Sequence, residues 1–302
     1  MLITDRVVWE NLMHSFRQEG VRLAVISDFD YTLTAFTHED GRRVYSSVGC
    51  VREMEETTLR YRREAAALYE QFIHFDIDPL LSFEERAEKM HEWWSRHYQL
   101  MFSEGISQDL LFRAGSEAGF FRLREGARDL MHFCAQADIP FITLSAGLGE
   151  VIRGFYTKED LYHMTDIVSN FFLYDEVGRS FDISAPIMHN YNKHTTKRLL
   201  DAPRLANLRP THCLVLGDSV GDSKMAHMFP DAMVLRIGIL GDHQAHMLPE
   251  YQTYFDAILF GNGSLRPVQE ILLDARAPMN SSLSFHAPAQ VHLPAETEKN
   301  RA

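Results

Sequence analysis

Cysteine is scarce in this sequence, which has three among 302 residues. Cys50, Cys134 and Cys213 are odd in number, lie far apart and form no Cys-x-x-Cys pair. A disulfide framework needs paired cysteines and a zinc knuckle needs closely spaced ones, so neither is indicated. We expect buried or surface thiols.

Long apolar runs are also missing. No stretch approaches the roughly 20 apolar residues that span a bilayer, and residues 1–10 lack the basic start and apolar block of a signal peptide. The composition, 45% hydrophobic and 24% charged, is that of a chain that buries a core. We therefore expect a cytoplasmic protein without membrane contact, built as one large domain with an insert.

Positive charge is in deficit, because 30 Lys and Arg stand against 42 Asp and Glu and give a net charge of −12. This charge opposes binding to a phosphate backbone, so a nucleic acid polymer is not an expected partner. A small anionic substrate is still compatible, because a divalent cation and one lysine can reverse the potential inside a cleft. No pattern indicates the oligomeric state.

An apolar run, residues 23–26, ends close to two carboxylates, Asp28 and Asp30. The run is typical of a strand covered on both faces of a parallel sheet, and such sheets bind ligands beyond the carboxyl ends of their strands. Two aspartates this close repel each other unless a cation or a shared proton holds them together. The simpler interpretation is that both aspartates are turn residues. The residues that follow two other expected strands, described next, argue against this interpretation.

Two further expected strands also end in small or acidic residues: 139–144 precede Ser145 and Ala146, and 212–216 precede Asp218 and Asp222. Main-chain amides after the first of these strands, where a helix begins, can receive phosphate oxygens. Asp218 and Asp222 read alone are possible helix caps. Their position at a strand end favours a metal site instead.

The remaining pattern predicts alternating helices and strands. Residues 82–85 form a capping box that starts a helix, and a hairpin is expected around residues 176–179. Other helices are expected over 5–20, 53–75, 82–102, 107–119, 127–137, 195–200 and 265–273, and other strands over 167–168, 233–237 and 257–260. We divide the chain into a catalytic core (1–35 and 120–275), a helical cap (36–119) and a mobile tail (276–302).

Four stretches in chain order resemble the motifs of the haloacid dehalogenase superfamily of phosphatases. They are Asp28 to Thr34 (Asp-Phe-Asp-Tyr-Thr-Leu-Thr), Leu144 to Gly147, Asn192-Lys193 and Gly217 to Asp222. The resemblance implies an α/β fold with a Rossmann-like parallel sheet and an inserted helical cap of the superfamily's first type. Lys193 alone would more often be a solvated lysine, but between the second and fourth motifs it becomes a site candidate.

The resemblance also implies a role for each site residue. Asp28 is the expected nucleophile, which forms an aspartyl-phosphate, and Asp30 is the expected acid and then base. Lys193 balances charge, and Ser145 binds a phosphoryl oxygen with nearby amides. Asp222 does not bind the metal directly but orients its ligands or a metal-bound water.

Magnesium fits this ligand set better than zinc, because the available ligands are carboxylate and carbonyl oxygens. Asp28, the main-chain carbonyl of Asp30 and Asp218 are its expected ligands.

A more specific resemblance, from about residue 22 to about residue 260, is to the cytosolic 5′-nucleotidase III (pyrimidine 5′-nucleotidase) family. It is carried by the motifs above and by Ile77-Asp78-Pro79, Glu92-Trp93, Ser145 to Gly149, Val168 to Phe171, Asn192 to His194 and Leu216 to Ser219. It implies hydrolysis of nucleoside 5′-monophosphates in a substrate site that includes Asp76, His97, Ser145, Ala146 and Lys193.

The departures from this family lie where the base is chosen. Asp76 stands where the family has a glutamate, His97 stands where it has a serine, and Tyr45 is the only ring in the stretch where the family places a histidine or an aromatic residue against the base. These relatives divide between pyrimidine nucleotides and 7-methylguanosine monophosphate, so the base preference is left open.

Two alternatives stand beside the Mg²⁺-dependent 5′-nucleotidase. One is a phosphatase for another small metabolite, such as a sugar phosphate, with the same chemistry. The other is a non-catalytic protein that binds a phosphorylated ligand; it predicts the loss of a catalytic group, and none is missing.

Overall fold

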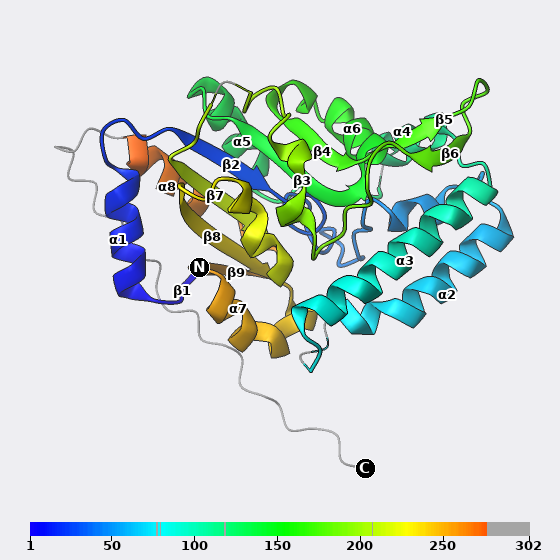
Figure 1. Cartoon of the computed structure of the whole chain (residues 1–302), viewed down its shortest axis with the longest axis horizontal. Helices are drawn as coiled ribbons and strands as arrows, with labels where there is room; N and C mark the ends of the chain where they lie inside the picture. Colours follow the sequence, from blue (N-terminus) through cyan, green and yellow to red (C-terminus); the bar gives the residue numbers. More distant parts are fainter. Residues whose placement is uncertain (77, 79, 118, 207, 277–302) are drawn as a thin grey trace, which may run out of the picture.

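The centre of the computed structural model is a seven-stranded sheet (Figure 1), and the structure describes residues 1–276 except 77, 79, 118 and 207. The strand order is β1-β9-β8-β7-β2-β3-β4. β1 pairs antiparallel with β9, and the other neighbours pair in parallel. The expected α/β fold with a mostly parallel sheet is confirmed. In sheet order the strands are Leu2–Ile3, Ala257–Phe260, Met233–Leu240, His212–Gly217, Leu23–Ser27, Phe141–Leu148 and Asp166–Asn170.

Strand β2 lies in the middle of the sheet and is buried along its whole length. Its side chains alternate between two cores, because successive residues of a strand point to opposite faces: Val25 packs in one core, and Ala24 and Ile26 pack in the other. Ser27 is in register with Thr143 of β3 and with Leu216 of β7. This register brings the ends of three strands to one edge of the sheet.

Helices cover both faces. One face packs against α1 (Arg6–Phe16), α5 (Ala127–Gln136), α6 (Gly149–Lys158) and α8 (Arg266–Arg276). The other face packs against the 3₁₀ segments η4 (Lys197–Leu199) and η5 (Val220–Met228), and α7 (Leu248–Tyr254) joins a smaller cluster beside it. The three cysteines are free and buried. No helix in the described part of the chain has the length and apolarity needed to cross a membrane.

The prediction of a helix over residues 195–200 is wrong. This stretch instead forms two short 3₁₀ segments, η3 (Lys193–Thr195) and η4, separated by Thr196 in an extended conformation. Adjacent β-branched threonines disfavour a helix, and the Thr195 hydroxyl donates to the Asn192 carbonyl at 2.9 Å, which offers the backbone a competing turn.

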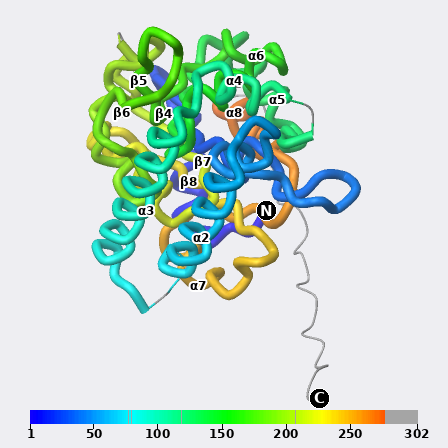
Figure 2. Tube along the Cα trace, turned by 90° about the vertical axis from the view of Figure 1, so that its right-hand side faces the viewer, coloured from blue at the N-terminus to red at the C-terminus, as the bar shows by residue number. Residues whose placement is uncertain are grey.

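The insert after β2 contains a short 3₁₀ segment and three helices: η1 (Gly49–Glu53), α2 (Leu59–Asp76), α3 (Phe83–Ser103) and α4 (Gln108–Ser116). The predicted capping box is present, because Ser82 accepts from the Glu85 amide and Glu85 accepts from the Ser82 amide. Figures 1 and 2 show α2 and α3 side by side, with the sheet strands behind them in the second view. The expected hairpin is found as β5 (Phe172–Tyr174) and β6 (Ser180–Ile183), and Phe172 packs against Tyr98 of α3.

Helix α4 packs closely on the core helix α6. A Cβ atom at Gly115 of α4 would lie 1.9 Å from the Val151 carbonyl oxygen of α6, so only glycine allows this approach. The division into core (1–35 and 120–275) and cap (36–119) stays a prediction; within the expected cap, this contact sets α4 apart from α2 and α3. The predicted tail lies outside the described residues apart from Arg276.

Candidate active site

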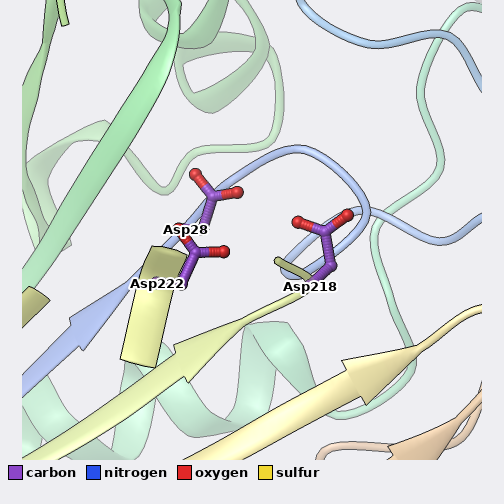
Figure 3. A group of neighbouring side chains, drawn as sticks. All are labelled: Asp28, Asp218 and Asp222. Carbon is purple, nitrogen blue, oxygen red and sulfur yellow. The ribbon is translucent and has the colours of Figure 1, made fainter. Parts of the chain in front are cut away.

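Three aspartates meet at the edge of the sheet where β2 and β7 end (Figure 3). Asp28 follows β2, Asp218 follows β7, and Asp222 lies in η5. One carboxylate oxygen from each lies within 4.8 Å of the others. The in-register strands explain this convergence, because the Asp28 amide donates to the Leu216 carbonyl at 2.9 Å and so places the two strand ends beside each other.

The charge of this cluster is compensated by a buried lysine. Lys193 is 1% exposed, and its Nζ lies 2.7 Å from Oδ1 of Asp28 and 2.8 Å from Oδ1 of Asp222. Burial opposes the ammonium charge, but the carboxylates of Asp222 and Asp28 outweigh it and raise the lysine pKa. One lysine cannot neutralise three aspartates. Burial, followed by the negative charge of Asp28, raises the pKa of Asp218 well above its usual range.

Both oxygens of Asp222 already have donors. Oδ1 accepts from Lys193, and Oδ2 accepts from the Ser219 amide at 2.9 Å. Asp222 is fully buried, so its contacts fix the position of Lys193. The role predicted for Asp222, the orientation of ligands or of a metal-bound water, stays a prediction.

The donor set fits a hard divalent cation. The oxygens of Asp28, Asp218 and Asp222 converge, and no thiol or imidazole belongs to the cluster in the described residues. Carboxylate oxygens suit Mg²⁺, and a divalent cation offsets the charge that Lys193 leaves uncompensated.

Asp30 is held apart from the three-aspartate cluster. Its Oδ1 accepts from the Ser47 amide at 2.7 Å, and its Oδ2 accepts from the Ser47 hydroxyl at 2.6 Å. Desolvation raises the pKa of Asp30 to about 7, although the bonds from Ser47 act in the opposite direction. A Cβ atom at Gly147 would lie 1.9 Å from the Ser47 hydroxyl, so glycine is needed there. Sequence reasoning missed Ser47; its only signal was its place in the stretch 45–49, near the start of the expected cap.

A cavity of about 420 Å³ extends from Asp28, Asp30 and Asp218, which form its acidic floor, toward α2 and α3. Nearly all the predicted site residues border it, namely Asp28, Asp30, Ser145, Ala146, Lys193 and Asp218 on the core side, and Asp76 and His97 on the cap side. Asp222 lies behind Lys193 rather than on the wall. A second hollow of about 520 Å³, near Asp5 and Arg236, contains none of these residues.

Asp76, at the end of α2, connects the cap to the loop that carries Lys193. The Asn190 side chain donates to its Oδ2 at 3.3 Å, and the Tyr191 hydroxyl donates to its main-chain carbonyl at 2.7 Å. Its Oδ1 is buried without a partner in the described residues, and burial raises the pKa of this carboxyl group.

His97 lies deeper, on α3. Its Nε2 is 3.2 Å from the Tyr61 hydroxyl, and its Nδ1 is buried without a partner in the described part of the chain. Burial, and then the positive charge of Arg52, lowers the pKa of His97 to about 4. The imidazole is therefore neutral at physiological pH.

Aromatic side chains also line the cap side of the cavity. Trp93 stacks on Trp94 with ring centroids 5.7 Å apart, and Tyr69 meets Trp93 edge-on at 5.9 Å. Tyr45, the ring expected near the base, also borders the cavity and packs edge-on against Phe120. Such a wall suits a flat ring system bound above the acidic floor.

Comparisons with known proteins find 5′-nucleotidases among those similar to this chain. The chain is 29% identical over 255 residues to the human 7-methylguanosine phosphate-specific 5′-nucleotidase, with 84% of each chain covered. It superposes on the crystal structure of cytosolic 5′-nucleotidase IIIB bound to cytidine with a TM-score of 0.81 and 26% identity, covering 90% of this chain and 92% of the other. A haloacid dehalogenase family hydrolase from Salmonella enterica shares the fold at a TM-score of 0.51 and 15% identity, covering 84% of this chain and 75% of the other.

The sequence model of one family, described as pyrimidine 5′-nucleotidase (UMPH-1), matches residues 31–275. That range contains β3, β7 and the whole cap, and it begins directly after Asp30. The expected haloacid dehalogenase-like fold is confirmed by the structural likeness. The chain belongs to the pyrimidine 5′-nucleotidase (UMPH-1) family and is a phosphoric monoester hydrolase.

Proposed function

We propose that this protein hydrolyses nucleoside 5′-monophosphates to nucleoside and phosphate in a Mg²⁺-dependent reaction through an aspartyl-phosphate. The observation that carries the proposal is the single cavity that joins Asp28, Lys193 and Asp218 to the aromatic wall of Trp93 and Trp94. A phosphate monoester and a flat base fit its two ends. The names of the relatives support a nucleotide substrate, and the likeness to a protein named cytosolic supports a reaction in the cytoplasm.

Phosphate esters resist attack because their negative charge repels nucleophiles. The site must therefore neutralise the phosphoryl oxygens and align the nucleophile with phosphorus. Asp28, Asp218 and the main-chain carbonyl of Asp30 would hold Mg²⁺, which supplies positive charge to the phosphoryl oxygens when bound. Ser145 and the amides that follow it bind the phosphoryl oxygens. Lys193, with its Nζ 2.7 Å from Oδ1 of Asp28, directs the Asp28 carboxylate at phosphorus.

The chemistry then follows in two steps. An Asp28 carboxylate oxygen attacks phosphorus, the bond from phosphorus to the ester oxygen breaks, and protonated Asp30 gives its proton to the departing oxygen. In the second step Asp30 takes a proton from water, the water oxygen attacks phosphorus, and the bond to Asp28 breaks. Free phosphate leaves and Asp30 is protonated again.

Phosphate release from a substrate panel tests the function. The panel is CMP, UMP, GMP, 7-methylguanosine monophosphate and two sugar phosphates, each with Mg²⁺ and with a chelator. We expect turnover of at least one nucleotide, and its loss on chelation, because the acidic cluster otherwise repels the substrate. Turnover of sugar phosphates alone would support the metabolite phosphatase. No turnover would support the non-catalytic binding protein.

Ser47→Ala tests the acid and base role of Asp30. The change removes the hydroxyl that donates at 2.6 Å and favours the ionised carboxylate, so the pKa of Asp30 rises above its value of about 7. A general acid acts while protonated, so the alkaline limb of the pH–rate profile is expected to move to higher pH. We also expect kcat to fall about tenfold or more, because a hydrogen bond that orients the Asp30 carboxyl group is lost.

Ser46→Ala is the matched control. Ser46 also borders the cavity, but its hydroxyl accepts from the Gly49 amide and does not contact Asp30. The ratio of variant to wild type with one substrate at each pH cancels the ionisation of the phosphate itself. A ratio that is constant across the pH range would contradict the role of Asp30.

A further inference from the structure

Arg52, a partly buried cation on the cavity wall, has no carboxylate partner among the described residues. Arg52 lies in η1, and its guanidinium carbon is 5.6 Å from the centroid of the Tyr69 ring. Within the described residues its guanidinium forms no ion pair or hydrogen bond, whereas Arg86 and Arg113 pair with Glu250 and Glu56. An unpaired, partly buried charge is unfavourable in a protein with an excess of acidic groups. Such a cation is suited to binding an electron-rich ligand.

The surroundings of Arg52 leave its charge uncompensated. His97, close enough for Arg52 to lower its pKa, is neutral. Asp76 is the acidic side chain on the cap wall; its Oδ2 accepts from Asn190, its Oδ1 has no partner, and within the described residues it forms no ion pair with Arg52. The aspartates on the core side face Lys193 and the expected metal. Exposed Arg43, over Tyr31 at 5.9 Å, adds a second positive charge on the same cavity.

We propose that Arg52 is a specificity-determining residue that binds the hydrogen-bond acceptor edge of an uncharged base and disfavours the cationic base of 7-methylguanosine monophosphate. This inference rests on the proposed nucleotidase function and concerns the base end of the same cavity. The pocket then takes nucleotides such as CMP or GMP.

The chemistry of the guanidinium group gives the reason. Its planar fork donates two parallel N–H bonds and matches two adjacent acceptors, such as N7 and O6 of guanine or N3 and O2 of cytosine. Methylation at N7 removes one of these acceptors and gives the ring a positive charge. The methylated base therefore loses a bond to Arg52 and gains a like-charge contact. GMP and 7-methylguanosine monophosphate differ only in this respect, so they form a matched pair of substrates.

Binding and turnover together test the proposal. Calorimetric titration with guanosine, 7-methylguanosine and cytidine measures recognition of the base without hydrolysis, and kcat/KM for the corresponding monophosphates measures it in the reaction. For the wild-type chain we expect GMP or CMP to be preferred over 7-methylguanosine monophosphate by at least about tenfold. In Arg52→Gln the preference should shrink about ten- to hundredfold, because the fork and its charge are both removed.

Two further variants sharpen the result. Arg52→Lys keeps the positive charge but loses the planar fork of donors. The kcat/KM for CMP and for GMP should therefore fall, while the kcat/KM for 7-methylguanosine monophosphate stays low. Arg42→Gln is the matched control, because Arg42 is exposed and paired with Asp40 at 2.7 Å outside the cavity. Its preference between GMP and 7-methylguanosine monophosphate should equal that of the wild type.

The outcomes separate this inference from the proposed function. Equal or tighter binding of 7-methylguanosine than of guanosine, unchanged in Arg52→Gln, would overturn the role of Arg52 even if nucleotides are hydrolysed. Failure of every nucleoside to bind would overturn it as well. Selective binding of guanosine or cytidine that depends on Arg52, without hydrolysis of their monophosphates, would uphold the role of Arg52 and refute the nucleotidase.

Discussion

Asp28→Asn is expected to lower kcat by about 10⁴-fold or more, the order of loss seen when a catalytic nucleophile is removed. The amide has nearly the same shape as the carboxylate but no charge to attack phosphorus. Phosphate release from the best nucleotide of the panel measures the loss. Mass spectrometry of acid-quenched enzyme should find a phosphoryl adduct on the peptide that contains Asp28 in the wild type and none in the variant.

The fold of this variant should persist. The amide of residue 28 still donates to the Leu216 carbonyl, and Lys193 keeps its bond to Asp222. Asp40→Asn is the control, because Asp40 is exposed and outside the cavity. Turnover within tenfold of the wild type by a folded Asp28→Asn chain would rule out Asp28 as the nucleophile.

Lys193→Met is expected to reduce both stability and activity. The ammonium pairs with Asp28 and Asp222 at 2.7 and 2.8 Å in a site closed to solvent. Methionine fills a similar volume but leaves two buried carboxylates without their cation, which lowers the free energy of unfolding by about 3–5 kcal/mol. Activity should fall at least about a hundredfold, because the charge that directs Asp28 is lost. Denaturant unfolding without metal measures the first effect.

The stability deficit should depend on charge. Burial raises the pKa of Asp222 to about 6 even beside Lys193. Loss of Lys193 raises this folded-state pKa further. A carboxyl group with a raised folded-state pKa loses stability as the pH rises up to that pKa, so the variant continues to lose stability above about pH 6, where the wild type no longer does, and its deficit should grow there. Mg²⁺ should restore part of the loss, as should the added change Asp222→Asn. Lys197→Met, at an exposed lysine of the same loop, is the control. Equal stability of Lys193→Met and Lys197→Met would show that the buried pairs are not needed.

Most local features of this fold could be predicted from the sequence. The run before Asp28 predicted a buried strand, because a strand covered on both faces needs apolar residues at every position. The capping box at Ser82 and the hairpin at 176–179 depend on residues a few positions apart, so short-range chemistry decides them. The helix expected over 195–200 failed for the same kind of local reason, since hydrogen bonding near Thr195 competes with a helix.

The floor of the site was predictable because parallel strands impose it. Once Asp28 and Asp218 follow neighbouring strands, the shared register brings their carboxylates to one edge. The wall of the cavity was not predictable in this way. Ser47 contacts Asp30 across 17 positions of irregular chain, and Arg52 reaches the cavity through its place beside Tyr69.

The sequence by itself therefore determined the chemical groups available to this protein, namely the carboxylates of Asp28, Asp30 and Asp218 and the ammonium group of Lys193. Only the tertiary structure decided which residues of the insert form the opposite wall of the cavity. Apolar periodicity shows which face of α2 and α3 is buried, but not which residues it meets when the insert folds over the sheet edge. The unpaired charge of Arg52 and the shielded position of His97 follow from that packing.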